Sequence, residues 1–313
     1  MTGSPASVPS RPADRPAPDF AGVIGPVVVA CSGGPDSVAL LVLAAEAELA
    51  PTAVYVDHGL RPDSARDFVT VQAAADTLGV PARLQRVVVG HGPNVEERAR
   101  DARYAALEMA RVELDATAIL VAHTADDQAE TVLLNVMRGS AGAGLSGMAA
   151  RRGAIVRPLL GIRRDDVRAV VDAHGLTTVD DEMNRDPRFR RAWVRHELLP
   201  MLGRGADRDL VPVLARQANL LRDESELLDE LGDALLAEAG VATPSTRVLR
   251  AAPRALARRA LRRWFGTPPP SADEIERVLA VVDGRAVAAE LAGGRRVRRS
   301  HGRLHRTDGG TVR

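Results

Sequence analysis

The sequence predicts an α/β fold in which a parallel sheet carries helices on both faces, followed by a small, mainly helical and basic C-terminal domain. Three observations support this prediction. Strand-like and helix-like segments alternate from Val23 to about residue 174. Several strand-like segments are short and apolar throughout, as expected of strands with both faces covered. Beyond Leu176 the alternation stops, and a polar segment, a helical segment rich in Leu, Asp and Glu, and a basic C-terminal region follow.

The expected strands are five short segments, VVVAC, TAVYVD, RLQRVVV, TAILVA and GAIVRPLL. Each is followed by a segment with helical periodicity, at residues 37–49, 64–78, 94–114, 126–137 and 163–174. Open parallel sheets bind ligands beyond the carboxyl ends of their strands. The polar stretches that follow the strands are therefore where a site is expected.

Composition, periodicity and turn residues divide the chain into four segments. Residues 1–20 are rich in proline and lack periodicity, which predicts a disordered leader. Residues 21–205 form the predicted sheet domain, and residues 206–243 a bridging helix with its periodic part at 208–239. Residues 244–313 form the predicted basic domain, with a helix over RALARRALRRWF, a helix start at Ser271 and a hairpin that turns at Gly293 and Gly294.

Composition narrows the class of protein. No apolar run approaches the roughly 20 residues that a membrane span requires, and the N-terminal stretch lacks the apolar core of a signal peptide. The single cysteine, Cys31, excludes an internal disulfide and a Cys-x-x-Cys metal site. A cytoplasmic protein with no membrane partner is expected.

The charge of the chain is unevenly distributed. All 42 basic residues are arginine, which excludes lysine-dependent catalysis. Residues 1–246 hold 26 arginines against 35 acidic residues, whereas residues 247–313 hold 16 against 6. Such a basic end suits a polyanion such as nucleic acid, and a solvated arginine-rich surface is an equally good interpretation of charge alone.

The first predicted strand runs into the loop SGGPDS, which consists of Ser32, Gly33, Gly34, Pro35, Asp36 and Ser37. Glycines let the backbone approach a ligand closely, and the start of the next helix favours an anion, so phosphate is the expected guest. Asp36 would repel phosphate unless a divalent cation or a cationic substrate group lies between them. The alternative is an ordinary glycine turn that caps a helix.

Two further strands end in polar clusters. The second strand ends with Asp57, His58 and Arg61, and the fourth runs into His123 and a helix start that carries Asp126, Asp127 and Glu130. Because Glu130 shares a helix face with both aspartates, the acids repel one another unless Mg²⁺ or a substrate ammonium separates them. The alternative is helix capping, which also favours acidic residues at this position.

Polar and basic residues form a third group of candidates. Asn184, Arg191 and Arg195 lie in the polar segment that follows the sheet domain's last helix, and the two arginines are one helical turn apart. Arg100 and Arg103 lie on the predicted helix NVEERARDARYAAL. These arginines suit phosphates or RNA, and the alternative for Arg100 and Arg103 is a solvated helix face.

Several of these motifs occur together in one known family. SGGPDS resembles the loop of the PP-loop ATP pyrophosphatases, which have an adenine nucleotide alpha hydrolase-like (Rossmann-like) fold. Together with VDHGLR, HTADDQAET, RGSAGAGLSGM, RPLL and the run from Asn184 to LLP, it resembles tRNA(Ile)-lysidine synthetase over about residues 25–205. The chain departs from that pattern at Ala192 and at DEMN, and it is similar to the family's short form with one small C-terminal domain.

The resemblance implies a ligase that joins free L-lysine to carbon 2 of the wobble cytidine in the CAU anticodon of tRNA(Ile). ATP first adenylates the cytidine oxygen and releases pyrophosphate, and the ε-amine of lysine then displaces AMP. The modified tRNA reads AUA instead of AUG and carries isoleucine instead of methionine.

The resemblance also implies site residues. It assigns ATP and Mg²⁺ to the loop from Ser32 to Ser37, with Asp57 and His58 also at the ATP site. The expected catalytic residues are Asp36, Asp127 and Glu130, and the expected Mg²⁺ ligands are Asp36 and Asp127. The expected contacts to tRNA or AMP are Arg61, Arg100, Arg103, His123, Asn184, Arg191 and Arg195.

Two other functions fit the same fold. A PP-loop tRNA base thiolase usually carries paired cysteines, and this chain has only Cys31. A non-catalytic nucleotide-sensing RNA-binding protein is the second alternative, against which the acidic residues at positions 36, 127 and 130 argue. The sequence leaves open the oligomeric state, with a homodimer among the arrangements it allows, and which carboxylate binds lysine.

Overall fold

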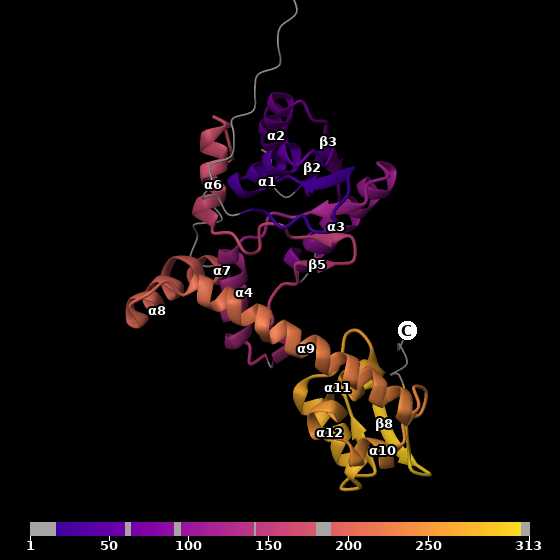
Figure 1. The fold of residues 1–313 in the computed structure, drawn as a ribbon. Helices are drawn as coiled ribbons and strands as arrows, with labels where there is room; N and C mark the ends of the chain where they lie inside the picture. Colours follow the sequence, from indigo (N-terminus) through magenta and orange to yellow (C-terminus); the bar gives the residue numbers. More distant parts are fainter. Residues whose placement is uncertain (1–16, 60–63, 91–94, 141, 180–188, 308–313) are drawn as a thin grey trace, which may run out of the picture. The chain divides into compact units, whose positions relative to one another are not determined.

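The computed structural model describes residues 17–59, 64–90, 95–140, 142–179 and 189–307. The chain divides into two compact units, Met1–Asn219 and Leu220–Arg313 (Figure 1). Residues 1–16 of the predicted leader lie outside the described residues. The end of that leader belongs to the fold, because the amide of Asp19 donates to the carbonyl of Pro158 at 2.9 Å and Phe20 packs against the core.

The first unit contains the predicted parallel sheet, with strand order β3-β2-β1-β4-β6-β5. Its strands are β1 (Val27–Ala30), β2 (Pro51–Asp57), β3 (Ala82–Arg86), β4 (Ala118–Leu120), β5 (Arg151–Arg152) and β6 (Ile155–Val156). All neighbouring pairs are parallel except β5 and β6 at one edge. The predicted fold class is therefore confirmed, with a short antiparallel edge strand added.

Alternation along β1 sorts its side chains onto two covered faces of the sheet. Val27 and Val29 join a core with residues of α1 (Pro35–Glu46), α2 (Ser64–Leu78) and α6 (Arg164–Ala173). Val28 points the other way, into a second core with Leu107 and Ala110 of α3 (Val95–Glu113). Because both faces are buried, the strand is apolar at every position, which explains its uninterrupted valines.

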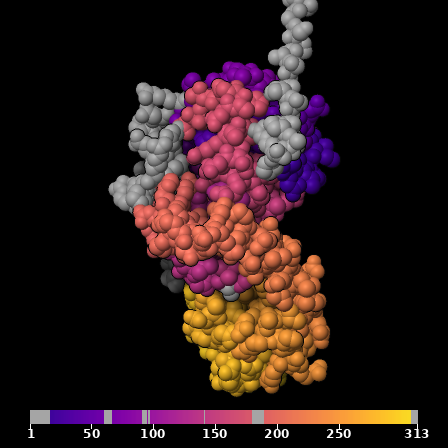
Figure 2. Space-filling model, turned by 60° about the vertical axis from the view of Figure 1, so that its left-hand side comes forward, coloured from indigo at the N-terminus to yellow at the C-terminus, as the bar shows by residue number. Residues whose placement is uncertain are grey.

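A layer of helices completes the first unit. It consists of α4 (Ala125–Met137), α5 (Gly142–Leu145), α7 (Arg190–Trp193), the π-helical turn η2 (Val194–Leu198) and α8 (Leu199–Ala206). Ala125 and Ala129 of α4 pack against Val211 and Ala215 of α9 (Val211–Ala239), which continues into the second unit. Figure 2 shows that α6 and the segment from α7 to α8 adjoin on one face of the first unit.

The second unit packs helices against a small antiparallel sheet. Besides the rest of α9 it contains α10 (Thr246–Ala251), α11 (Arg254–Phe265), α12 (Ala272–Asp283), β7 (Ala288–Glu290), the short η3 (Ala292–Gly294), β8 (Arg296–Ser300) and β9 (Arg303–Thr307). Ser271 caps α12, where it exchanges hydrogen bonds with Glu274. The predicted α11, the predicted helix start at Ser271 and the turn at Gly293 and Gly294 are all present.

Part of the positive charge of this region is neutralised inside the second unit. Four arginines of α11 form ion pairs with acidic residues: Arg254 with Glu276 and Asp283, Arg258 with Glu276, Arg259 with Asp229, and Arg263 with Asp233. The charge available to a polyanion is therefore smaller than the sequence count suggests. Within the described part of the chain, no helix is both long and apolar enough to cross a membrane.

Candidate functional site

A pocket of about 980 Å³ lies in the first unit, where β1, β2 and β4 end. The loop from Ser32 to Ser37 forms one wall, and side chains of α3, α4, α6 and α7 contribute to the others. The position is the one expected for an open parallel sheet, because the polar segments that follow neighbouring strands meet at this edge. Sequence segments far apart are thereby brought to one cavity.

The loop that follows β1 is shaped by its glycines and closed by a serine. Gly33 has φ +82°, and a Cβ there would lie 2.9 Å from Cγ2 of Val179. Gly34 is the N-cap of α1 and Pro35 its first residue. The hydroxyl of Ser37 donates to the carbonyl of Gly34 at 2.8 Å and accepts from the amide of Ser32 at 3.1 Å. The loop is therefore held open and fixed at a helix N-terminus that favours anions.

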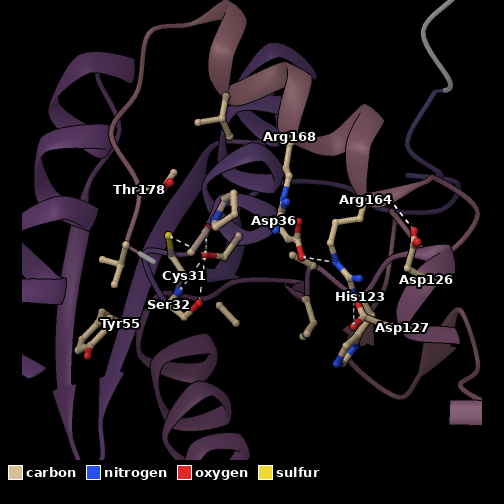
Figure 3. Close-up of a pocket in the computed structure, with 18 of the residues that line it drawn as sticks. Cys31, Ser32, Asp36, Tyr55, His123, Asp126, Asp127, Arg164, Arg168 and Thr178 are labelled. Carbon is tan, nitrogen blue, oxygen red and sulfur yellow. Dashed lines mark hydrogen bonds and ion pairs between the residues drawn. The ribbon is translucent and has the colours of Figure 1, made fainter. Parts of the chain in front are cut away.

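The side chain of Asp36 extends from this loop toward Arg164 (Figure 3). Its Oδ2 is 3.5 Å from Nε of Arg164, and its side chain is 26% exposed. Its Oδ1 is buried and has no hydrogen-bond partner within the described residues. Burial raises the pKa of Asp36 to about 6, against the opposing effect of Arg164. A carboxylate with one buried oxygen that lacks a hydrogen-bond partner is suited to hold a cation.

Glu130 is fully buried and is surrounded by arginines. Its Oε1 accepts from Nε of Arg195 at 2.7 Å and from Nη2 of Arg164 at 3.2 Å. Its Oε2 accepts from Nε of Arg191 at 2.8 Å and from Nη2 of Arg195 at 3.2 Å. Glu130 does not line the main pocket, whereas all three arginines do. The carboxylate therefore holds the guanidinium groups in place around the cavity.

Asp127 combines helix capping with ion pairing. Its Oδ2 accepts from the amide and the hydroxyl of Thr124, at 2.9 and 3.0 Å, in a capping box. Its Oδ1 accepts from Nη2 of Arg164 at 2.9 Å. Burial alone would raise the pKa of Asp127, but Arg164 and Arg191 outweigh it and the pKa lies below its usual range. Both oxygens are thus engaged within the protein.

Arg164 is the central residue that the sequence analysis missed. It is the first residue of α6, its side chain is 10% exposed, and it contacts Asp36, Asp127 and Glu130. Burial would lower the pKa of Arg164, but Asp127 and Glu130 reverse that effect and raise it. The sequence does contain a pattern that points to Arg164. The stretch RPLLGIRRDD places Arg163 and Arg164 at the start of a helix, where a cation is unfavourable unless an acid compensates it.

The cations expected between the carboxylates are therefore supplied in part by the chain. Arg164, Arg191 and Arg195 neutralise Asp127 and Glu130, and Arg163 pairs with Asp126 at 3.2 Å. No group of three or more metal-ligating side chains is found among the described residues. This compensation could not be seen in the sequence, because the arginines follow the acids by 34 to 68 positions.

Two histidines of the pocket are neutral and have arginine donors. Nε of Arg157 donates to Nδ1 of His123 at 3.1 Å, and burial lowers the pKa of His123 to about 4. Nε of Arg103 donates to Nε2 of His58 at 3.3 Å, and burial lowers the pKa of His58 as well. Each neutral ring therefore carries its proton on the nitrogen that does not face the arginine.

The structure brings most of the expected site residues to one cavity. Those that line it are Ser32, Gly34, Pro35, Asp36, Ser37, His58, Arg100, Arg103, His123, Asp127, Arg191 and Arg195. Gly33 and Asp57 belong to the adjoining loop and strand end but do not line the cavity. Arg61 and Asn184 lie outside the described residues.

Comparison with protein families gives two matches. Residues 24–202 match the PP-loop domain, and residues 235–305 match the TilS substrate binding domain. The first match contains the loop, the acidic helix start and the arginines described above. The second contains α11, α12 and the small sheet.

Named relatives agree with these matches. The chain is 42% identical to a tRNA(Ile)-lysidine synthase of Nocardia farcinica, over 86% of this chain and 84% of the relative. It is 40% identical to a tRNA(Ile)-lysidine synthase of Thermobifida fusca, over 89% and 90%. A solved structure of the U34-tRNA thiolase NcsA from Methanococcus maripaludis with its [4Fe-4S] cluster aligns with a TM-score of 0.51 and 16% identity, over 63% of this chain and 72% of that one. This last likeness concerns the fold alone.

Proposed function

The chain belongs to the tRNA(Ile)-lysidine synthase family of PP-loop proteins, and from this premise we propose that its pocket joins lysine to the wobble cytidine of tRNA(Ile) bearing the CAU anticodon. The observation that carries the proposal is the single cavity shared by the phosphate loop and the arginine–carboxylate cluster. The loop suits ATP, and the cluster suits a reaction in which negative charge builds up on a departing phosphate group.

The proposed reaction has two steps. The oxygen on carbon 2 of the cytidine attacks the α-phosphorus of ATP, and the bond from that phosphorus to the bridging oxygen breaks to release pyrophosphate. The ε-amine of lysine then attacks carbon 2, and the bond from carbon 2 to oxygen breaks to release AMP. Both steps build negative charge on a departing phosphate, so fixed donors and cations should accelerate both.

We assign the phosphates of ATP to the loop from Ser32 to Ser37, and the adenosine side to His58 and Asp57 at the end of β2. Asp36 fits Mg²⁺, because it has an open buried oxygen and Mg²⁺ usually takes only one or two carboxylates besides substrate phosphates. Mg²⁺ held there would neutralise charge on the leaving pyrophosphate. Asp127 as a second ligand has less support, because both of its oxygens already accept hydrogen bonds.

The arginines of the cluster receive the departing groups in this proposal. Arg191 and Arg195 line the cavity and form ion pairs with Glu130 and Asp127, so they are held in position for AMP or the tRNA backbone. Arg100, whose guanidinium lies 5.1 Å from the ring centre of Tyr104, is assigned to the tRNA side. The other proposed contacts to tRNA or AMP are Arg61, Arg103, His123 and Asn184.

Lysine needs both a cation site and a proton acceptor. Its ε-amine is protonated near neutrality, with a pKa of about 10.4 in water, and must lose a proton before it attacks. Asp36, with its pKa of about 6, is a better acceptor than Asp127, whose pKa is lowered. Once pyrophosphate has left, the same carboxylate faces the incoming amine. Asp127 and Glu130 then act through the arginines they hold.

The second unit is assigned to tRNA. Its match to a substrate binding domain and its excess of arginine support this assignment, although the α11 arginines Arg254, Arg259 and Arg263 are paired internally. A homodimer and a cytoplasmic location remain predictions from the sequence.

The decisive experiment incubates the protein with ATP, Mg²⁺, labelled lysine and tRNA(Ile) bearing CAU. Label is expected in the tRNA, with AMP and pyrophosphate released in equal amounts, whereas thiolation or nucleotide sensing would give no label. Asp36→Asn should slow the first step strongly at a Mg²⁺ concentration that suffices for wild type, measured as pyrophosphate release without lysine. Asp76→Asn, at an exposed residue of α2, is the control and should keep both steps. If Asp36→Asn adenylates tRNA normally and fails only with lysine, Asp36 binds lysine and not the metal.

A further inference from the structure

Arg168 is a cation of the same pocket that no step above uses. It lies on α6 one turn after Arg164, is exposed and lines the cavity. Its side chain extends from α6 toward Asp36 (Figure 3). Arg164 makes ion pairs with three carboxylates, whereas the structure shows no hydrogen bond or ion pair of the Arg168 side chain with any described residue.

The surroundings of Arg168 call for an anion of more than one charge. The N-terminus of α1 brings a positive dipole end beside the loop, and no side chain caps it. Asp36, the acid nearest to that end, already compensates Arg164 at 3.5 Å. The Arg168 guanidinium, which makes no ion pair with a described residue, and this helix N-terminus both lie beside Asp36, whose charge Arg164 already partly neutralises. Asp165 and Asp172 of α6 also line the cavity, so the excess of positive charge is local to Asp36. A group with several negative oxygens would balance it better than a monoanion.

The position of Arg168 also selects one end of the nucleotide. In Figure 3 Arg168, Asp36 and Arg164 lie on one side of the loop, and Tyr55 at the end of β2 lies on the other. Because the adenosine is assigned to the β2 side, the phosphates farthest from it lie toward α6.

We propose that Arg168 contacts the β- and γ-phosphates of ATP and holds the departing pyrophosphate. The inference rests on the proposed function, since it takes ATP to be the ligand of the pocket. As the bond between the α-phosphorus and the bridging oxygen breaks, its electron pair passes to that oxygen. The guanidinium donates hydrogen bonds to the pyrophosphate oxygens, whose charge increases in this step.

The test compares three ligands in Arg168→Gln, measured by direct binding in the presence of Mg²⁺. A lost charge-assisted hydrogen bond corresponds to about a ten- to hundredfold weaker affinity, which is expected for ATP and for pyrophosphate. AMP, which lacks the β- and γ-phosphates, should bind within about twofold of wild type. Arg168→Lys keeps the charge but not the planar fork and should lose less affinity for pyrophosphate than Arg168→Gln.

The control is Arg83→Gln. Arg83 lies on β3, does not line the cavity and forms an exposed ion pair with Glu113 of α3, so this variant removes the same charge at a distant place. It should bind all three ligands as wild type does. Equal losses for AMP and ATP in Arg168→Gln, or no loss for pyrophosphate, would overturn the inference while leaving the proposed function intact. Wild-type protein that binds neither ATP nor pyrophosphate would overturn both.

Discussion

Replacement of Glu130 by glutamine should destabilise the first unit strongly. The side chain is fully buried and accepts hydrogen bonds from Arg164, Arg191 and Arg195. Glutamine keeps the volume but removes the charge, so three guanidinium groups are left with Asp127 as their shared acidic partner. Removing one partner of a buried ion pair costs about 3–5 kcal/mol, because the remaining charge is uncompensated. We expect the free energy of unfolding of this unit to fall by about 3 kcal/mol or more.

The chain offers a separate probe for each unit. It has two tryptophans, Trp193 in α7 of the first unit and Trp264 in α11 of the second. In a Trp264→Phe background the remaining Trp193 fluorescence reports unfolding of the first unit. In a Trp193→Phe background the remaining Trp264 fluorescence reports unfolding of the second. For a unit of this size, a loss of 3 kcal/mol lowers the melting temperature by roughly 6–12 °C. In Glu130→Gln the Trp193 transition should move by that amount, and the Trp264 transition should stay.

Glu113→Gln is the matched control, because it removes the same charge from an exposed pair with Arg83. Exposed pairs contribute about 0–1 kcal/mol, so its Trp193 transition should barely move. A Glu130→Gln protein that unfolds within about 1 kcal/mol of wild type would refute the buried-network argument. The same outcome would indicate that water or another anion compensates the arginines in solution.

Two further predictions concern the phosphate loop. Burial places the pKa of Asp36 at about 6, above its usual 3.8, so adenylation should decline as the pH falls through 6 if the ionised form is required. The folded state binds that proton more tightly than the unfolded chain, so protonation of Asp36 raises the free energy of unfolding as the pH falls from about 6 toward 4. Asp36→Asn should remove this pH dependence, measured by urea titrations at each pH. Gly33→Ala should destabilise the unit by about 1–2 kcal/mol, because φ is +82° and the new Cβ would meet Val179. Gly34→Ala, with φ −70° and its nearest neighbour 3.6 Å from the new Cβ, is not strained and should cost less, about 0.5–1 kcal/mol for an alanine at the N-cap.

The fold was predictable because each local pattern agrees with its tertiary setting. The valines of β1 are apolar on both faces since helices cover both, and the glycine loop follows directly where a strand must turn into a helix. The helix over residues 254–265 coincides with α11 to the residue. Hydrophobic periodicity and turn residues were sufficient to predict these elements, because contacts with residues distant in sequence were not needed to define them.

The chemistry of the site was harder to predict, because it depends on pairs distant in sequence. The sequence pointed to Asp127 and Glu130 as carboxylates awaiting a cation, and the structure gives both of them arginine partners. Helix capping and function were treated as alternatives for Asp127, yet its two oxygens serve both Thr124 and Arg164. Helical spacing identifies side chains that share a face, but it cannot show which distant residues face them.

Among the buried or half-buried acids of the site, Asp36, Asp126, Asp127 and Glu130, one buried oxygen is left without a partner in the described part of the chain. Asp126 pairs with Arg163 and accepts from the amide of Arg164 at 2.7 Å, Asp127 accepts at both oxygens, and Glu130 is enclosed by arginines. Only the Oδ1 of Asp36 is a buried carboxylate oxygen without a partner in the described part of the chain.

The arginines would then decide where Mg²⁺ binds, because they pair with Asp126, Asp127 and Glu130 and leave Asp36 as its ligand. Asp126→Asn should lower stability by about 1–3 kcal/mol, because it weakens the contact to Arg163 and keeps an oxygen for the amide. Its Mg²⁺ requirement in the adenylation step should match that of wild type, whereas Asp36→Asn should need at least about tenfold more Mg²⁺. Equal shifts of the Mg²⁺ titration in the two variants would mean that the metal is held by the acidic cluster as a whole and not by the open oxygen of Asp36.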